Sequence, residues 1–441
     1  TVDSVIKFLD GKTGSDAPPK ADGRPRTMTF TKAEPYTEKK TALAIVSDEP
    51  YPFYSRIMLS KPNFFLEKIP FEQVFLKNEF WYTEQNITFL GGKKATGLNS
   101  AEKTVSLDNG TVLQYEKLLL AIGGEARHWD PAQVKGTDKK GIYHLRDLDE
   151  GKEIMETVKT AKRAVCIGGG FVSFEICELL QMKGIETTLL IMESYYWANL
   201  WDETSGLIVE DYLRQGGVKI IKNELTEEVL GAEKVEGLRT KTGKEIPCDM
   251  IIVGIGLYCP VKQFVDAGVD CSRGIKTNDY LETNLPDIWA AGDAAEFYDV
   301  VVGEPVQLGN WANAQMQGRI AALNMLGKKQ QFRMVSFYIT QSFGLTIAFV
   351  GDVRVPPDRT IITRGSRELK SYGRLLLKDK ELVGATLLNR TPEMAPISKL
   401  IEKDVDVSAH HAELTDSNFD LKKLIPLNRA IGTIGATSSK T

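Results

Sequence analysis

The chain has 441 residues, 42% of them hydrophobic, and a formal net charge of -4. This length allows two or three domains with sizeable cores, because single cores stop growing at about 250 to 300 residues. The slightly acidic balance gives no reason to expect nucleic acid or an anionic membrane as a partner, since both recruit clustered positive charge. Small molecules and other proteins remain as partner classes.

Cysteine and histidine usage argues against a metal site. The five cysteines include no CxxC pair and no closely spaced Cys/His set, so neither zinc nor an iron-sulfur cluster is predicted. Two of the four histidines are adjacent, at His410 and His411, and solvated histidines are expected rather than ligands. No apolar run reaches the roughly 18 residues of a membrane-spanning helix. We expect a soluble, cytoplasmic protein whose secretory signal is absent or already removed.

The first part of the chain changes character at Leu43. Residues 1–42 carry "GKTGSDAPPKADGRPR" and predict an irregular lead-in, because such a segment can bury little. From Leu43 on, short apolar runs alternate with longer amphipathic segments, which is typical of βαβ units. Between Phe89 and Leu120 we expect a meander of three strands, "ITFLGG", "KTVSLDNGTVLQY" and "KLLLAIGG", with a hairpin turn at residues 108–110.

The same plan is then repeated. A second βαβ pattern runs from Ala164 to Met192, and a second meander around "VEGLRTKTGKEI" precedes the strand "MIIVGIG". After Phe332 the pattern favours antiparallel strands followed by a helix in "MAPISKLIEK". The predicted fold class is α/β, with two Rossmann-like nucleotide-binding domains of the three-layer ββα type and a C-terminal α+β domain. The expected boundaries are 1–42 for the lead-in, 43–140 with 268–333 for the first domain, 141–267 for the second, and 334–441 for the C-terminal interface domain.

The sharpest motif is "RAVCIGGGFVSFEICELLQMKGIETTLLIMES". A strand from Ala164 to Ile167 is expected to turn through three glycines into a helix from Val172 to Met182, and a second strand is expected to end at Glu193. The chemistry requires glycine at Gly168 for the tight turn and at Gly170 so that backbone can approach a pyrophosphate. That anion would lie on the helix N-terminus, where free N-H groups favour it.

The acid and the third glycine position refine this prediction. Glu193 stands close to the spacing of the acid that binds an adenosine 2'-hydroxyl, and its charge would repel a 2'-phosphate, so NADH is favoured over NADPH. Ser173 replaces the third glycine of the fingerprint. The alternative to a nucleotide site is a structural turn bent by glycines.

A second candidate site lies in "TNLPDIWAAGDAAEF". Asp293 follows an apolar strand, where its carboxylate can accept a hydrogen bond from a buried sugar-like hydroxyl; a helix-capping aspartate is the alternative. The helix after it is expected from about Trp311 to Leu326. Its positive N-terminal end would suit an anionic reduced isoalloxazine.

At this point the chain resembles the pyridine nucleotide-disulfide oxidoreductase superfamily, in particular its NADH:ferredoxin or rubredoxin reductases and apoptosis-inducing-factor-like flavoproteins. The resemblance covers about residues 43 to 425. It is carried, in the family's order, by "SDEPYPFYSRIMLSK", "YEKLLLAIGGEAR", "CIGGGFVSFE", "MIIVGIG", "TNLPDIWAAGD", "WANAQMQGRIAALNMLG" and "SFYITQSFGLTIAFVGD". It implies that FAD and NAD are cofactors, that NADH gives a hydride to FAD, and that electrons pass to a small iron-sulfur carrier protein. A homodimer is also implied.

The resemblance assigns roles to single residues. Lys61 and Glu175 match the family's pair near the flavin and the nicotinamide and are the expected catalytic residues, since a cation near flavin N5 stabilises charge that develops on hydride arrival. The residues implied in cofactor binding are Asp48, Glu49, Arg56, Lys61, Gly123, Gly124, Arg127, Gly168, Gly170, Phe171, Val172, Glu175, Glu193, Gly256, Gly292, Asp293 and Trp311.

Some of these roles are specific. Asp48 or Glu49 is implied as the acid for the flavin-side ribose, Arg56 as a cation near the pyrophosphate, and Asp293 as the acid for the ribityl chain. The glycines of "AIGG" match the family's second flavin turn. In the C-terminal domain, Phe337, Thr340 and Phe343 are expected near the ring, or alternatively in the core of an alternating strand.

Two departures from the family pattern leave alternatives open. No redox cysteine occurs near Tyr54, so electrons must leave the flavin directly, to a one-electron carrier, a quinone or oxygen. The family opens with strand, GxGxxG and helix, whereas the first 43 residues offer only Gly11, Gly14 and Gly23 in another setting, and "GKTGSD" is not a P-loop. The hypotheses are an FAD-dependent reductase, a non-enzymatic NADH-binding or interaction protein that has lost normal FAD binding, and an NADH oxidase-type enzyme.

Overall fold

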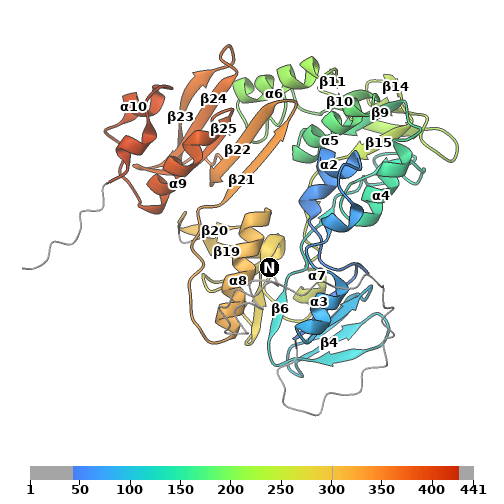
Figure 1. Ribbon diagram of the computed structural model, residues 1–441, viewed down its shortest axis with the longest axis vertical. Helices are drawn as coiled ribbons and strands as arrows, with labels where there is room; N and C mark the ends of the chain where they lie inside the picture. The colour runs from blue at the N-terminus through green and yellow to red at the C-terminus, as the bar shows by residue number, and fades with distance from the viewer. Residues whose placement is uncertain (1–42, 300, 427–441) are drawn as a thin grey trace, which may run out of the picture.

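The computed structural model describes residues 43–299 and 301–426, whose sheets fall into three units (Figure 1). The irregular lead-in expected for residues 1–42, with its three glycines, and the end of the chain after residue 426 lie outside the described residues. The α/β class with a C-terminal α+β part is confirmed by the sheets.

The second unit is built on a continuous five-stranded parallel sheet in the order β11-β10-β9-β15-β8. Its elements are β8 (Ile142–Tyr143), α4 (Leu148–Thr157), β9 (Arg163–Ile167), α5 (Phe171–Met182), β10 (Glu186–Leu190), α6 (Glu203–Gln215), β11 (Lys219–Ile221) and β15 (Met250–Val253). All of β15 and all of β9 except Arg163 is buried, as a parallel sheet covered on both faces requires. The second meander is confirmed as the antiparallel strands β12 (Thr226–Leu230), β13 (Gly237–Thr240) and β14 (Glu245–Pro247).

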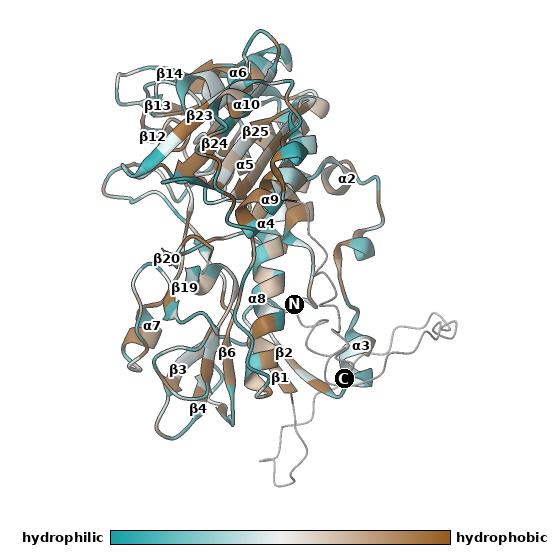
Figure 2. Ribbon diagram, turned by 90° about the vertical axis from the view of Figure 1, so that its left-hand side faces the viewer, coloured by the Kyte–Doolittle hydropathy of each residue, from teal (hydrophilic) through white to brown (hydrophobic). Residues whose placement is uncertain are grey.

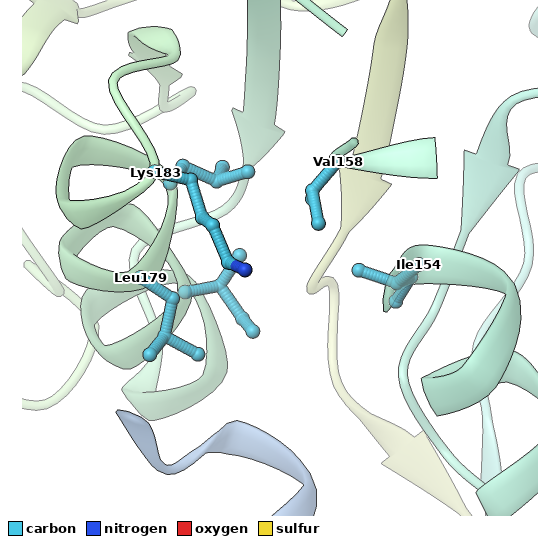
Figure 3. Close-up of a pocket in the computed structure, with 6 residues that line it drawn as sticks. Ile154, Val158, Leu179 and Lys183 are labelled. Atoms are coloured by element: carbon cyan, nitrogen blue, oxygen red, sulfur yellow. The ribbon is translucent and has the colours of Figure 1, made fainter. Parts of the chain in front are cut away.

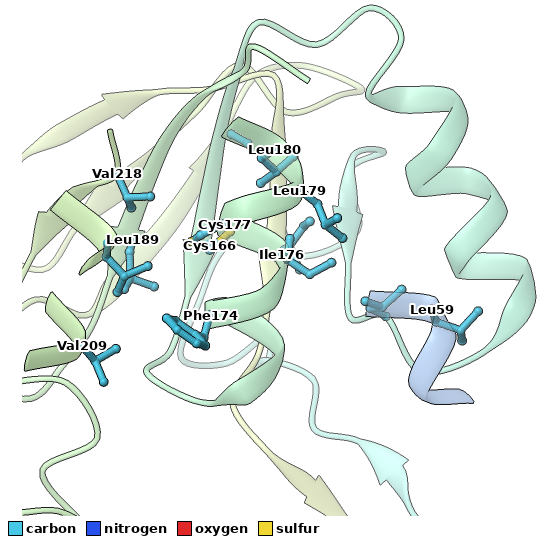
Figure 4. Close-up of a cluster of buried hydrophobic side chains, with 14 of the residues drawn as sticks. Leu59, Cys166, Phe174, Ile176, Cys177, Leu179, Leu180, Leu189, Val209 and Val218 are labelled. Carbon is cyan, nitrogen blue, oxygen red and sulfur yellow. The ribbon is translucent and has the colours of Figure 1, made fainter. Parts of the chain in front are cut away.

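Helix α5 is buried on more than one side (Figure 4). Phe174 and Cys177 belong to one apolar cluster with Cys166 of β9 and Leu189 of β10. The same cluster includes Leu59, which lies on the short helix η1 (Arg56–Ser60) of the first unit. A helix packed on several sides needs apolar residues around most of its circumference, and "FVSFEICELLQM" supplies them. Helix α5 is therefore shared by the cores of two units.

The first unit has a divided sheet. Strand β1 (Leu43–Ser47) pairs in parallel with β2 (Ile87–Gly91), and β6 (Leu118–Leu120) pairs in parallel with β18 (Ile288–Ala290), in two separate two-stranded sheets. Their apolar side chains fall into separate clusters. The unit also contains α2 (Pro62–Phe65), η2 (Phe71–Val74), α3 (Glu79–Glu84), β3 (Ala95–Asn99), β4 (Thr104–Leu107), β5 (Val112–Gln114), α7 (Lys262–Val265), β17 (Ile275–Thr277), η3 (Gly292–Ala294), β19 (Ala295–Asp299), β20 (Glu304–Val306) and α8 (Trp311–Met325).

The prediction for the first meander was wrong in two of its three strands. The meander is β3-β4-β5, whereas "ITFLGG" forms β2 beside β1 and "KLLLAIGG" forms β6 beside β18. A short apolar run has the same pattern whether its partner is parallel or antiparallel, so the sequence did not separate these cases. The hairpin turn at residues 108–110 is confirmed between β4 and β5, with Gly110 at a φ of +83°.

The C-terminal unit is an antiparallel sheet in the order β21-β22-β25-β24-β23, with helices packed against it. Its elements are β21 (Phe337–Ser342), β22 (Leu345–Gly351), β23 (Arg359–Ser366), β24 (Ser371–Lys378), β25 (Glu381–Leu388), η4 (Thr391–Glu393), α9 (Met394–Glu402), α10 (His411–Thr415) and η5 (Leu421–Leu424). The sheet lies beside α6 of the second unit (Figure 1), where Arg367 makes two hydrogen bonds of 2.7 Å to the carboxylate of Asp211.

Apolar residues concentrate on the strands of this sheet, as at β24 and β25 (Figure 2). These residues form a buried apolar core together with residues of the helices packed on the sheet. In the described ranges 43–299 and 301–426, no helix is long and apolar enough to cross a membrane.

A buried ionic cluster joins the C-terminal unit to β20. The carboxylate of Asp352, which is 2% exposed, accepts hydrogen bonds from Arg354 at 2.8 Å and from the buried Arg359 at 3.3 Å. Both arginines also reach Glu304 of β20, at 2.9 and 3.2 Å. Burial opposes ionisation of Asp352, but its bonds to Arg354 outweigh burial and hold its pKa below the usual range.

We expect Asp352→Asn to destabilise the C-terminal unit by about 3 kcal/mol, because it leaves the charge of Arg359 buried with one partner fewer. The matched variant Asp358→Asn removes an exposed partner of the same arginine and should cost less than about 1 kcal/mol. Urea unfolding followed by limited proteolysis measures both. Because a lowered pKa stabilises the fold above about pH 4 and less as the pH falls, the Asp352→Asn and wild-type proteins should converge in acid. Equal losses for the two variants would contradict this account.

Candidate active site

In the turn between β9 and α5, Gly168 is required by the fold, whereas Gly170 leaves space for a ligand. Gly168 has a φ of +96°, and a Cβ there would lie 2.3 Å from the carbonyl oxygen of Gly254. A Cβ on Gly170 would meet nothing within 4 Å. Gly170 is the N-cap of α5 and brings no side-chain cap, so the first N-H groups of the helix stay available to a ligand. This open helix end fits an anion such as a pyrophosphate.

Ser173 can replace the third glycine of the fingerprint because a glycine, Gly254, lies opposite it at the end of β15. Ser173 is fully buried against the end of β15, and a Cβ on Gly254 would lie 2.8 Å from its Oγ. The close approach of helix and strand that the third fingerprint glycine normally permits is therefore provided by Gly254. Sequence reasoning missed Gly254, although "IIVGIG" contains it.

Glu193 lies beyond the strand that was expected to end with it. Strand β10 ends at Leu190, and the chain then turns, with the carbonyl of Glu193 accepting a hydrogen bond from Asn223 N-H at 3.2 Å. The prediction of a strand up to Glu193 was therefore wrong by three residues. The Oε2 atom of Glu193 is buried without a hydrogen-bond partner among the described residues. A buried acceptor of this kind suits a hydroxyl donor of a ligand.

Aromatic rings surround the start of α5. The ring of Phe171 lies 4.4 Å from that of Tyr338 on β21 and 4.7 Å from that of Trp197, between centroids, while Val172 is half-buried. On the other side, Gly256 adopts a φ of +102° and accepts the backbone N-H of Arg127 at 2.9 Å. Arg127 and Gly256 flank a two-stranded ribbon formed by β7 (Glu125–Ala126) and β16 (Leu257–Tyr258).

Lys61 and Glu175, far apart in sequence, form an ion pair where the three units meet. The carboxylate of Glu175 is 5% exposed and also accepts hydrogen bonds from the hydroxyls of Ser60 and Thr340. The ammonium of Lys61 in turn donates to Thr340 Oγ1 at 3.2 Å. The sequence predicted the pair through the family resemblance, but not the two hydroxyls that complete it.

The acidic residues after β1 are held differently from one another. Asp48 is exposed, whereas the carboxylate of Glu49 forms an ion pair with Arg56 and accepts the hydroxyl of Tyr54. Arg56 also donates to the carbonyl of Arg146 at 2.8 Å. Glu49 and Arg56 therefore form one polar cluster, from which a ribose hydroxyl would have to displace an existing contact.

Asp293 is half-buried in the first unit, and its carboxylate accepts no hydrogen bond from another described residue. Burial raises the pKa of Asp293, and the positive charges of Arg146 and Arg56 partly offset this rise. Asp293 lies within η3, and the N-cap of α8 is Asn310, so the helix-capping alternative is wrong. A half-buried carboxylate without a partner among the described residues, near two arginines, fits a polyhydroxyl chain next to an anionic group.

Arg146 was missed by sequence reasoning. Its Nε donates to the carbonyl of Gly124 at 2.6 Å, and Gly123, at a φ of +67°, leaves room for its guanidinium. Burial, followed by the charge of Arg56, lowers the pKa of Arg146. Nothing in "HLRDL" distinguishes this arginine from one on the surface, because its partners are distant in the chain.

The other two expected residues of the flavin side lie on neighbouring elements. Gly292, at a φ of +79°, opens η3 and donates its N-H to Gln317 of α8 at 2.7 Å. Trp311 is the first residue of α8 and is partly exposed. Because Asn310 caps that helix by accepting Asn313 N-H at 2.9 Å, the helix end is less open than that of α5.

A small cavity between α4 and α5 has no place in this site (Figure 3). Its volume is about 10 Å³, enough for at most one water molecule, and it is lined mainly by apolar side chains, including Ile154, Val158 and Leu179. We also find no cluster of three or more metal-ligating side chains in the ranges 43–299 and 301–426.

Residues 30–318 match the family model described as pyridine nucleotide-disulphide oxidoreductase, and residues 337–425 match the model described as reductase C-terminal. The chain belongs to the pyridine nucleotide-disulphide oxidoreductase family. Members of this family are oxidoreductases that use FAD and a pyridine nucleotide, so FAD and NAD are the cofactors against which the site is judged. The open turn at Gly170, the buried Oε2 of Glu193 and the half-buried carboxylate of Asp293 fit them.

Three similar proteins illustrate the family. The ferredoxin–NAD(+) reductase component of the biphenyl dioxygenase system from Paraburkholderia xenovorans is 27% identical over 87% of this chain and 92% of its own length. The nitrite reductase [NAD(P)H] of Bacillus subtilis is 27% identical over 83% of this chain, which spans only 44% of that protein. The crystal structure of the covalent putidaredoxin reductase-putidaredoxin complex aligns with a TM-score of 0.81 and 25% identity, covering 87% of this chain and 92% of the other.

Alanine variants at the two outer glycines of the turn should affect different properties, stability at Gly168 and NADH binding at Gly170. We expect Gly168→Ala to lower the thermal unfolding temperature, because the methyl group would clash with Gly254 and the φ is positive. Gly170→Ala should unfold like the wild type, since its φ is -108° and the space is open, yet bind NADH at least about tenfold more weakly. Melting curves and a tryptophan-fluorescence titration with NADH measure these effects. Wild-type NADH affinity in Gly170→Ala would show that the pyrophosphate lies elsewhere.

Proposed function

We propose that this protein is an FAD-containing oxidoreductase that takes a hydride from NADH and passes electrons to a small redox protein of the ferredoxin or rubredoxin type. The Lys61–Glu175 pair, with its buried carboxylate, carries the proposal, because it joins the first unit to α5 one helical turn after the open glycine turn. When bound, FAD would supply the exchange between two-electron and one-electron chemistry that such a reaction requires. The relatives named ferredoxin–NAD(+) reductase and putidaredoxin reductase support the choice of acceptor class.

The proposal divides the chain's residues between the two cofactors. Residues 43–140 with 268–333 would form the FAD domain, 141–267 the NAD domain, and 334–441 the interface domain, except that α7 (Lys262–Val265) packs with the first unit. In the FAD domain, Asp293 would bind the ribityl hydroxyls, and Arg56 would lie near the pyrophosphate together with Arg146, whose guanidinium is also close to Asp293. Asp48, which is exposed and forms no ion pair with another described residue, is the better candidate for the adenosine ribose than Glu49.

On the NAD side, the open N-terminus of α5 would hold the pyrophosphate and Glu193 the adenosine ribose. Phe171, Val172 and their aromatic neighbours would exclude water from the reacting end. Lys61 would present its ammonium to the charge that develops on hydride transfer, and Glu175 would hold that ammonium in place.

The cysteines support direct exit of the electrons. Among the described residues Cys166, Cys177 and Cys248 are buried, and burial raises the pKa of the half-buried thiols Cys259 and Cys271. A protonated thiol is a poor nucleophile, so no described cysteine is poised for disulfide chemistry. Free thiols also support the proposed cytoplasmic setting. A homodimer formed through the C-terminal domain is part of the same proposal.

The divided sheet of the first unit favours one second candidate, a non-enzymatic NADH-binding protein that has lost normal FAD binding. In the second unit the glycine turn follows the central strand β9, whereas the described part of the first unit has no strand joining β1 to β6. A visible absorption spectrum of the purified protein, before and after addition of FAD, decides between the candidates. Flavin bands together with NADH-dependent reduction of a ferredoxin support the reductase. Their absence in both samples supports the second candidate.

We expect Lys61→Met to lower kcat for NADH-dependent reduction by about a hundredfold, because the positive charge beside the reacting centre is lost. Lys68→Met, which changes an exposed lysine just beyond α2, is the matched control and should leave turnover unchanged. Stopped-flow measurement of the step from NADH to flavin separates this effect from that of the acceptor. A wild-type rate for Lys61→Met would remove Lys61 from the mechanism.

Glu193→Arg should weaken NADH use and improve NADPH use, because the carboxylate that repels a 2'-phosphate is replaced by a cation that binds one. We expect the ratio of kcat/KM values for the two nucleotides to change by at least about tenfold. Glu186→Arg, at the exposed start of β10, the strand that precedes Glu193, controls for the change in charge. An unchanged ratio in Glu193→Arg would mean that Glu193 does not face the adenosine ribose.

A further inference from the structure

Strand β21 approaches α5 with every second residue. Tyr338, Thr340 and Ser342 are buried or half-buried on that side, whereas Phe337 and Ile339 point outward and are 44% and 49% exposed. This is the period of two that a strand imposes. Strand β21 is at the edge of its sheet, and it reaches α5 through these inward side chains.

Two of these side chains contact acids one helical turn apart. Thr340 bonds to Glu175, while the hydroxyl of Ser342 lies 3.1 Å from Glu178 Oε2 and the N-H of Phe343 donates to Glu178 Oε1 at 2.6 Å. Residues three apart on a helix lie on one face, so a strand beside it can reach both. The two bonds to Glu178 attach the end of β21 to α5. The contact at Glu175 differs, because it also includes Lys61.

Thr340 is 3% exposed and its hydroxyl has two roles at once. It donates to Glu175 Oε1 and accepts from Lys61 Nζ at 3.2 Å. A hydroxyl can bridge a carboxylate and an ammonium in this way because it is both donor and acceptor. A valine of the same shape could fill the space but could make neither bond. Tyr338, two residues earlier on the same face of β21, packs its ring 4.4 Å from that of Phe171, between centroids, and burial raises the pKa of its phenol.

We propose that Thr340 is a positioning residue, through which the C-terminal domain fixes the orientation of the Lys61–Glu175 pair. The inference rests on the proposed NADH reductase function for its catalytic consequence. Its structural content is independent of that function: with the hydroxyl in place, Lys61 is held by two contacts, and without it by one. The competing explanation is that Thr340 only helps β21 to pack on α5.

Three variants separate positioning from packing. Thr340→Val keeps the shape and removes the hydroxyl, and Thr340→Ser keeps the hydroxyl. Ser342→Ala is the matched control on the same strand and face, because it weakens the contact with Glu178 and leaves the pair untouched. Each variant is tested for kcat and KM with NADH and, without reference to activity, for the rate at which acetic anhydride labels Lys61. Mass spectrometry reads this rate against that of exposed Lys68; Lys61 is 29% exposed, so the reagent can reach it.

We expect Thr340→Val to lower kcat about tenfold with little change in KM, since binding of NADH does not involve the hydroxyl. Labelling of Lys61 should rise severalfold in Thr340→Val. Thr340→Ser should stay within about twofold of the wild type in both measurements, and so should Ser342→Ala.

Two results would overturn the inference. One is wild-type labelling of Lys61 in Thr340→Val; the other is an equal change in Ser342→Ala, which would mean that docking alone matters. Failure of the proposed function has a different outcome, in which wild-type protein supplied with FAD does not oxidise NADH. A rise in Lys61 labelling confined to Thr340→Val would still support the positioning role in that case.

Discussion

The three units meet around the carboxylate of Glu175, which is almost completely removed from water. Burying an ionised group is costly unless hydrogen-bond donors and an opposite charge replace its hydration. Here the donors come from both neighbours of α5: Ser60 and Lys61 from the first unit, and Thr340 from the C-terminal unit. Assembly of the units and formation of the site are therefore one event, since each satisfies the charge that the other requires.

Other polar contacts support this arrangement at a distance from the site. Arg367 and Asp211 join the C-terminal sheet to α6, and Asp352 with its two arginines joins it to β20. The first contact is partly exposed and should contribute little to stability, whereas the second is buried and costly to break. The C-terminal unit therefore contacts both other units, and its apolar residues Leu345, Ile347 and Leu388 belong to one cluster with the core of the second.

The candidate site residues that the sequence predicted are those whose positions depend on neighbouring residues in the chain. The spacing of Gly168, Gly170 and Glu193 is dictated by one turn and one helix, so the motif identified them even though strand β10 ends earlier than expected. Gly254 and Arg146 were not predicted, and neither were the contacts of Thr340 with Glu175 and Lys61, because each depends on a partner brought near only by the fold. The same limit explains the error over β2 and β6: their apolar runs were visible, but a run of two-residue period does not specify which strand it joins. The two βαβ units and the C-terminal sheet were predictable because each is encoded by a long series of strand-like and helix-like segments.

The pairing of β6 with β18 bears on the order in which the chain acquires its structure during synthesis. Leu118 meets Ile288 only after the whole of the second unit, from β8 to β15, has been made between them. The second unit is continuous in sequence, so it can form before β18 has been made. The apolar residues of β6 remain without their partner strand during that interval. A nascent chain paused there would expose "KLLLAIGG" to solvent.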